Sequence, residues 1–459
     1  MSTALHKWSG AQRVALLVVT FAFTLIVRVR GISTHFWLLG DQIRDWTIAL
    51  GPFADLPLVG PPMHVGGYTI GPAFYWILWA IRVVVGPWFH NLPHAGGIGQ
   101  AMLQSAADTL LLAAVWHRTQ SVWIALTTVV VLATAAYDLC LSALVWNAVA
   151  GSTLAKAATA LILLDWPRKS ATRIVLTAAL AWSAVHAHTG AIFVTTSVFV
   201  ALLVDPFVRG ERHTTPRNAW IIAAVVAILQ LPYLAYQLLH RFGDSAMGAV
   251  TGGLQRIVTG DALPEFTKSV TGYANAFTFI EGAPWPVPFL AWMLLASGAI
   301  VAVRYRRDPS LLAITLLPQV AAVIGYALFL GDLDHYYYLS LMPAAVLTIV
   351  LAATPPSSYR LAPLVGIALL VGAVALVPAR LRFAATMHRL PEYGALVEGS
   401  RKIASLGQPM REIVTEFALP KTSDPEYVYK ILGGRIDRAS PWIGVITAKG
   451  DVVYRKVEG

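Results

Sequence analysis

The stretch GDQIRD, residues 40–45, places two carboxylates and a guanidinium within six residues. Asp41 and Asp45 are four residues apart, so in a helix they would share one face, with Arg44 beside them. A carboxylate can remove a proton from a reacting group, and a guanidinium can hold an anion. The pattern indicates a catalytic or transport pocket. The alternative is that the two carboxylates only solvate the face of a surface helix.

Further polar residues interrupt the otherwise apolar sequence. Ionisable groups near lipid cost free energy, so their presence suggests a functional site. The candidates are His64, Asp138, Asn147, His186, His188, Arg256, Lys268, Asp334, His335 and Tyr336. Several have simpler interpretations. Asn147 after Trp146 is also typical of an interfacial anchor or helix cap, and His188 of a hydrogen bond between helices. The run HYYYL would fit an aromatic belt, and Arg256 and Lys268 would fit solvated loop charges.

Metal and disulfide chemistry find little support in the sequence. Cys140 is the single cysteine, which excludes a disulfide framework within the chain and a thiolate metal site. His186 and His188 are closer in sequence than the ligands of common zinc motifs, and no third ligand accompanies them. We therefore expect no cofactor. A divalent metal would be possible but is not expected.

Composition defines the elements that must position these residues. Of the 459 residues, 57% are hydrophobic and 13% are charged, with a mean hydropathy of +0.63. Soluble domains have about a quarter of their residues charged, so the chain is predicted to be an all-α polytopic membrane protein. The net charge of +10 comes from short basic clusters between apolar segments, as membrane topology requires, and does not indicate nucleic acid.

The basic clusters assign a topology of about eleven transmembrane helices, with the N-terminus in the cytoplasm and the C-terminus outside. This places a first external loop at 31–97 and a large external loop at 241–284. Segment 174–204 must then form a tight helix pair that turns at HAHTG, residues 186–190. Only one crossing can separate the first external loop from the next cytoplasmic cluster. Segment 69–86, which Arg82 interrupts, is therefore predicted to lie along the membrane surface. The candidate polar residues then gather at the external face.

The chain divides into a transmembrane domain, 1–380, and a small extracytoplasmic tail, 381–459. The tail reads as an α+β unit. Periodicity and stop signals predict helices at 391–407 and 424–434 and a strand at 411–419. Two further strands are predicted within 442–457, around a Lys-Gly-Asp turn. Such a unit would bind an acceptor or cover the pocket.

The order of motifs over roughly residues 10–380 resembles the C-type (GT-C) superfamily of membrane glycosyltransferases. An acid follows the first helix, and the Gly/Pro-aromatic run GGYTIGPAFYW comes after it. Then come WN, a His-Thr-Gly turn, LPYLAYQLL before a large loop, and HYYYLSLMP entering a late helix. Within this superfamily it resembles the bacterial branch that is similar to aminoarabinose transferases and protein-O-mannosyltransferases.

The resemblance implies inverting transfer of a sugar from a polyprenyl-phosphate donor to a glycolipid, polysaccharide or protein acceptor, at the outer face of a bacterial plasma membrane. It implies Asp41 as general base. Gln42 departs from the family's common Asp-Glu pair, which leaves Asp45 as the alternative base. The implied donor-phosphate ligands are Arg44, Arg256, Lys268 and His335. The implied substrate-binding residues are Asp45, His64, Asn147, His188, Asp334 and Tyr336.

Two other functions remain open at this level. A secondary transporter would have inverted repeats and a site near the bilayer midplane, whereas the sequence shows no repeat on inspection. A polysaccharide polymerase or ligase would use a polyprenyl-pyrophosphate donor and an external loop rich in Arg and His, whereas here the first loop carries the acids.

Overall fold

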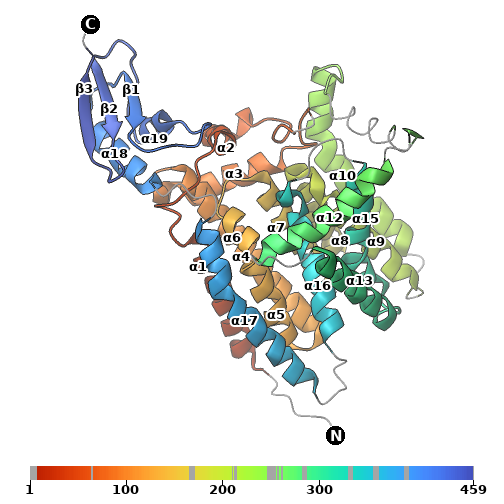
Figure 1. The fold of residues 1–459 in the computed structure, drawn as a ribbon. Helices are drawn as coiled ribbons and strands as arrows, with labels where there is room; N and C mark the ends of the chain where they lie inside the picture. Colours follow the sequence, from red (N-terminus) through yellow and green to blue (C-terminus); the bar gives the residue numbers. More distant parts are fainter. Residues whose placement is uncertain are drawn as a thin grey trace.

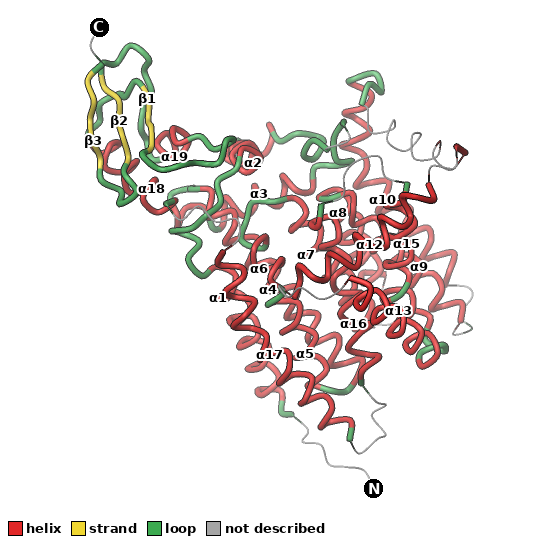
Figure 2. The backbone as a smooth tube through the Cα atoms, viewed as in Figure 1, coloured by secondary structure: helices red, strands yellow, loops and turns green. Residues whose placement is uncertain are grey.

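The computed structural model describes most of the chain. The described residues are 8–63, 66–164, 171–208, 210, 214–244, 255, 258–259, 262–281, 287–328, 334–354, 361–386 and 392–457. They form a helical bundle with a small sheet at one end (Figure 1, Figure 2).

The bundle consists of helices of very different lengths. They are α1 (Gly10–Val29), α2 (Gly40–Leu50), α3 (Ala73–Val84), α4 (Pro93–Thr119), α5 (Val122–Ala133), α6 (Ala136–Leu141), α7 (Asn147–Leu164), α8 (Ala171–Ala187), α9 (Ile192–Val208), α10 (Thr214–Leu239), α12 (Ala262–Glu281), α13 (Val287–Arg304), α14 (Pro309–Thr315), α15 (Leu317–Ala327), α16 (Met342–Ala353) and α17 (Ala362–Thr386). Short 3₁₀ helices join them: η1 (Phe53–Asp55), η2 (Gly86–Phe89), η3 (Thr189–Ala191) and η4 (His335–Leu341).

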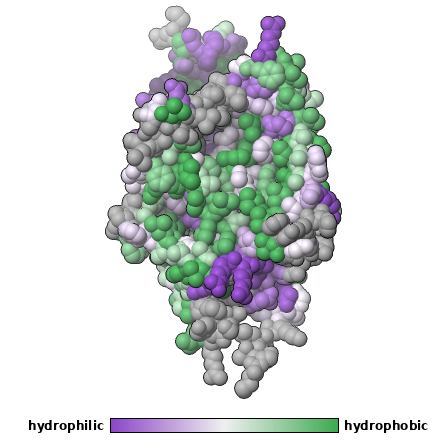
Figure 3. Space-filling model, turned by 90° about the vertical axis from the view of Figure 1, so that its right-hand side faces the viewer, coloured by the Kyte–Doolittle hydropathy of each residue, from purple (hydrophilic) through white to green (hydrophobic). Residues whose placement is uncertain are grey.

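Apolar helices confirm a multi-pass membrane protein. Within the described residues, seven helices are long and apolar enough to cross a bilayer, and five shorter apolar helices accompany them. One face of the molecule has a broad hydrophobic band in the middle, with hydrophilic residues gathered above and below it (Figure 3). The tight pair predicted at 174–204 is present as α8 and α9, which turn through η3. The count of eleven crossings and the orientation of the termini stay predictions.

Each of the two predicted external loops contains helices within its described residues. The first, 31–97, contains α2 and α3, which pack on each other, and the first turn of α4. The second, 241–284, contains α12, which packs on α13 and α15. At 12 residues α3 is shorter than the roughly 20 that a span needs. In Figure 1, α2 and α3 lie at the end of the bundle nearest the sheet. The surface placement of 69–86 remains a prediction.

The tail is the α+β unit expected from the sequence. It comprises α18 (Tyr393–Ser405), β1 (Glu412–Thr415), α19 (Pro425–Ile431), β2 (Trp442–Ile446) and β3 (Val452–Lys456). The sheet order is β1-β2-β3, with β1 parallel and β3 antiparallel to β2. Asp424 caps α19, and Pro425 occupies its first turn. The proposed boundary between domains, at 380, falls inside α17, which continues to Thr386.

A network of buried charges ties four helices of the bundle together. The Arg28 guanidinium on α1 contacts Asp108 of α4 at 2.6 Å and Asp138 of α6 at 2.7 Å. Lys156 of α7 contacts the second Asp108 oxygen at 2.5 Å, and Gln104 donates to Asp138. Asp138 was expected at the external surface. It is buried because the Arg28 guanidinium, which has no exposed side-chain surface, needs a carboxylate partner.

We predict that Asp108→Asn destabilises the protein by about 3–5 kcal/mol, because it leaves the Lys156 ammonium buried without its counter-charge. The double variant Asp108→Asn/Lys156→Met restores neutrality and should recover most of the loss. Thermal unfolding of the detergent-solubilised protein measures both. Glu398→Gln, which breaks the exposed Glu398–Arg401 pair, serves as control and should cost less than about 1 kcal/mol. Equal losses for Asp108→Asn and Glu398→Gln would contradict the prediction.

Candidate active site

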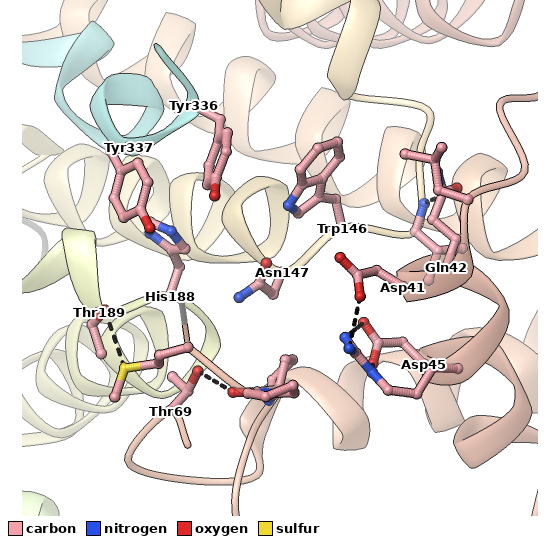
Figure 4. A pocket seen from close by; sticks show the side chains of 16 residues that line it. Asp41, Gln42, Asp45, Thr69, Trp146, Asn147, His188, Thr189, Tyr336 and Tyr337 are labelled. Atoms are coloured by element: carbon pink, nitrogen blue, oxygen red, sulfur yellow. Dashed lines mark hydrogen bonds and ion pairs between the residues drawn. The ribbon is translucent and has the colours of Figure 1, made fainter. Parts of the chain in front are cut away.

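The first external loop and three parts of the bundle line a cavity of about 290 Å³ (Figure 4). The walls come from α2, from the loop before α3, from the start of α7, and from the 3₁₀ turns η3 and η4. The lining residues are Leu39, Asp41, Gln42, Arg44, Asp45, Pro61, Pro62, Met63, Thr69, Val145, Trp146, Asn147, His188, Thr189, Tyr336 and Tyr337. The cavity therefore brings together segments separated by up to about 300 residues of sequence.

The three charged residues of α2 form one ion-paired unit. Arg44 Nε and Nη2 bind the two Asp45 oxygens at 2.8 and 3.1 Å, and Nη1 binds Asp41 Oδ1 at 2.7 Å. Asp45 is buried, with 5% of its side chain exposed, whereas 77% of the Asp41 side chain is exposed. The two carboxylates share a helix face as expected, but only Asp41 is open to a reactant.

Asp45 is held by more than Arg44. The Tyr75 hydroxyl of α3 donates to Asp45 Oδ1 at 3.0 Å. Burial raises the pKa of the Asp45 carboxyl, and the hydrogen bonds and positive charge of Arg44 together with the Tyr75 hydrogen bond oppose that rise. Asp45 thus anchors Arg44, and Arg44 in turn orients Asp41.

The side chain of Gln42 takes the place of the Glu in an Asp-Glu pair and makes contacts that depend on its amide. Its side-chain amide donates to the Trp37 carbonyl at 2.6 Å and accepts from the Val145 backbone N–H at 3.4 Å. An ionised carboxylate at this position can only accept, so it could not make the bond that Gln42 donates to the Trp37 carbonyl. The amide joins the start of α2 to the segment that leads into α7. It therefore sets the position of Asp41 relative to Asn147.

Asn147 and His188 provide polar groups on the wall opposite α2 (Figure 4). Asn147 is the first residue of α7, and His188 precedes η3. Within the described part of the chain, neither side chain makes a hydrogen bond with the protein. His188 is 7% exposed, and burial lowers its pKa to about 4. A neutral imidazole and a carboxamide therefore remain available for a ligand, each as both donor and acceptor.

The tail domain contacts the opposite face of the charged helix. Thr422 Oγ1 accepts from the Gly40 N–H at 3.1 Å, and Thr47 Oγ1 donates to the Tyr427 hydroxyl at 3.1 Å. A Cβ at Gly40 would lie 3.0 Å from the Thr422 Cβ, so a larger residue would push the tail away. These contacts fix both ends of α2 and give the tail a positioning role. Whether it also binds an acceptor stays a prediction.

The loop from 66 to 72 needs its glycines. Gly66 and Gly67 have φ of 91° and 71°, which side chains rarely adopt. A Cβ on Gly71 would lie 2.2 Å from the His186 ring. His186 is buried behind this loop and bonds to Gln230 at 3.2 Å, so it does not line the cavity.

The predicted site residues divide into three groups. Asp41, Arg44, Asp45, Asn147, His188 and Tyr336 line the cavity. Lys268, Asp334 and His335 are not among the described residues that line it: Lys268 is 72% exposed and paired with Glu265, and Asp334 precedes η4 at an exposed position. His64 and Arg256 lie outside the described residues.

Sequence reasoning missed Gln42, Thr69, Trp146, Thr189 and Tyr337 as lining residues. Each is adjacent to, or within a few residues of, a predicted site residue or a motif that carries the family resemblance. The motifs gave the right segments, but they did not say which neighbouring side chains face inward. Among the described residues, no group of three or more His, Cys, Asp or Glu side chains is arranged to hold a metal ion.

Comparisons with known proteins identify the fold. No protein-family model and no curated protein sequence matches the chain. The crystal structure of ArnT from Cupriavidus metallidurans bound to undecaprenyl phosphate matches with a TM-score of 0.55 at 14% identity, over 94% of this chain and 87% of ArnT. The apo structure of the same protein matches with a TM-score of 0.53 at 13% identity, over 93% and 86% of the two chains.

The chain has the GT-C fold. The fold expected from the sequence resemblance is thereby confirmed, and the match extends through the tail as well as the membrane domain. At 14% identity the likeness to ArnT concerns the fold alone. The chemistry of this chain therefore depends on the residues of its own cavity.

The neutral state of His188 gives a stability prediction. Its pKa is about 4 in the folded protein and about 6.5 when unfolded, so the unfolded state takes up a proton first as pH falls. The resulting decrease in the free energy of unfolding begins near pH 6.5 and reaches about 2 kcal/mol at pH 5. His188→Gln should therefore lose less stability than wild type between pH 7.5 and pH 5. Chemical denaturation in detergent measures the difference.

The matched control is His35→Gln, at an exposed position outside the cavity lining. It should show the same pH dependence as wild type. An unchanged pH dependence for His188→Gln would mean that His188 is already protonated in the folded protein at pH 5.

Proposed function

We propose that this protein is an inverting glycosyltransferase that moves a sugar from a polyprenyl-phosphate donor to an acceptor hydroxyl at the outer face of a bacterial plasma membrane. The observation that carries the proposal is the exposed Asp41 carboxylate at the edge of the cavity, held by Arg44. The GT-C fold supports it, since ArnT, which shares the fold, has been crystallised with undecaprenyl phosphate.

In this proposal Asp41 is the general base. It takes the proton of the acceptor hydroxyl as the acceptor oxygen bonds to the anomeric carbon, while the bond from that carbon to the phosphate oxygen breaks. The products are the glycosylated acceptor and free polyprenyl phosphate. A single exposed carboxylate suits direct displacement with inversion, because retention requires a nucleophile and a separate acid–base group. General-base assistance contributes about 10²–10⁴-fold to the rate.

Asp45 is assigned a positioning role. The Asp45 oxygens accept from Arg44 and Tyr75, and the side chain is nearly inaccessible, so an acceptor hydroxyl does not reach it without displacing these partners. This favours Asp41 over the alternative base that the sequence left open.

Arg44 retains capacity for the donor phosphate. A guanidinium has five N–H groups, and three of them point at Asp41 and Asp45. The remaining two are available to phosphate oxygens, and 36% of the Arg44 side chain is exposed. The unit of two carboxylates and one guanidinium has a net charge of −1, so the leaving phosphate needs further positive charge. Arg256, Lys268 and His335 stay the proposed sources.

The test is release of free polyprenyl phosphate by purified protein from a panel of radiolabelled polyprenyl-phosphate sugars, with candidate glycolipid, polysaccharide and protein acceptors. Asp41→Asn should lower the rate by about 10²-fold or more, because it removes the base and keeps the side-chain shape. Asp55→Asn is the matched control: Asp55 lies in the same loop, is exposed, and does not line the cavity. It should retain wild-type activity.

Full activity of Asp41→Asn together with an inactive, folded Asp45→Asn would transfer the base role to Asp45. If no donor releases polyprenyl phosphate and liposomes take up a solute regardless of both substitutions, the protein is a transporter. Release that requires a pyrophosphate-linked donor would favour a polymerase or ligase.

A further inference from the structure

The cavity has an aromatic side that the general-base mechanism does not use. Trp146 and Tyr336 line it with ring centroids 5.2 Å apart, and Tyr337 stacks on Tyr336 at 4.7 Å. Trp37 extends the row behind Trp146 at 6.4 Å. Trp146 and Tyr336 are only partly buried, so part of each ring surface faces the cavity.

The backbone of Trp146 is held by the side chain of Gln100. Gln100 of α4 accepts from the Trp146 N–H at 3.0 Å and donates to its carbonyl at 3.1 Å. One side chain thus satisfies both backbone groups just before α7 begins. Residues that present a binding surface are effective when their own positions are fixed by such supporting contacts.

Polar groups next to the rings complete a site for a sugar. Asn147 follows Trp146 directly and points into the cavity, and the His188 ring lies 6.0 Å from the Tyr336 ring (Figure 4). His188 is more than nine-tenths buried, and its side chain makes no hydrogen bond within the described residues. A sugar ring presents C–H groups on its faces and hydroxyls at its rim. Such a ring would stack on the aromatic side and bond to the amide and imidazole.

Size limits what the cavity accepts. Pockets for small ligands run from about 300 to 1,000 Å³, and this cavity of about 290 Å³ lies at the lower end. It suits one sugar ring.

We infer that Trp146 and Tyr336 form a stacking platform for a single sugar ring of the donor, which Asn147 and His188 orient with its anomeric carbon toward Asp41. The inference rests on the proposed function and adds to it the class of donor, a polyprenyl-phosphate monosaccharide, and a residue, Trp146, that selects it.

The experiment compares the affinities of the purified full-length protein for two probes, undecaprenyl phosphate and undecaprenyl phosphate bearing the radiolabelled monosaccharide that wild type turns over. Trp146→Ala should weaken binding of the sugar-bearing lipid by about tenfold and leave the bare lipid phosphate within about twofold. Trp146→Phe keeps a smaller ring and should lose less. Trp88→Ala, at a position 82% exposed and outside the cavity lining, should change neither affinity.

Equal weakening of both probes by Trp146→Ala and Trp146→Phe would assign Trp146 to the lipid or to folding and overturn the inference, as would no weakening at all. Turnover of a donor with a disaccharide as fast as the monosaccharide would also overturn it. In each of these cases wild-type turnover still supports the proposed function. Failure of wild type to bind or turn over any polyprenyl-phosphate sugar would instead contradict the proposed function itself.

Discussion

The contact between Arg44 and the buried carboxylate of Asp45 is the interaction on which the site depends. Burial makes an ionised carboxylate costly, and the two-point bond to Arg44 with the hydrogen bond from Tyr75 offsets that cost. The same guanidinium reaches Asp41 in the preceding turn of the helix and holds it at the edge of the cavity. The buried Asp45 thus determines, through Arg44, where the exposed Asp41 carboxylate lies. Within these few residues, Asp45 anchors the guanidinium and Asp41 faces the cavity.

The rest of the structure positions this helix relative to α7. Gln42 connects the start of α2 to Val145, and Gln100 holds the backbone of Trp146, so two side-chain amides align the acidic and aromatic sides of the cavity. The tail contacts the outer side of α2 at Gly40 and the bundle supports the inner side. Deeper in the bundle, the buried charges around Arg28 join α1, α4, α6 and α7. A small movement of α2 would change the distance between Asp41 and the aromatic side of the cavity.

Composition and periodicity predicted the larger features because these depend on local rules. The apolar segments, the tight turn at His188, and the helices and strands of the tail follow from hydrophobic period and turn residues. Contacts between distant segments did not follow. The sequence placed Asp138 at the surface, because nothing local shows that Arg28 requires it 110 residues away. Likewise, Trp146 becomes a cavity wall only when η4 brings Tyr336 against it.

The central claim is that a lipid-linked sugar occupies the space between Asp41 and the aromatic side. Photo-crosslinking tests it most directly. The probe is an undecaprenyl-phosphate monosaccharide that carries a diazirine on its sugar. It is irradiated with the protein in membranes, and the labelled peptides are sequenced. The account predicts labels within the segments 39–45, 145–147 and 336–337, which contribute lining residues to the cavity, and the loss of these labels when excess unlabelled donor is present. Labels confined to segments that do not line the cavity would contradict it.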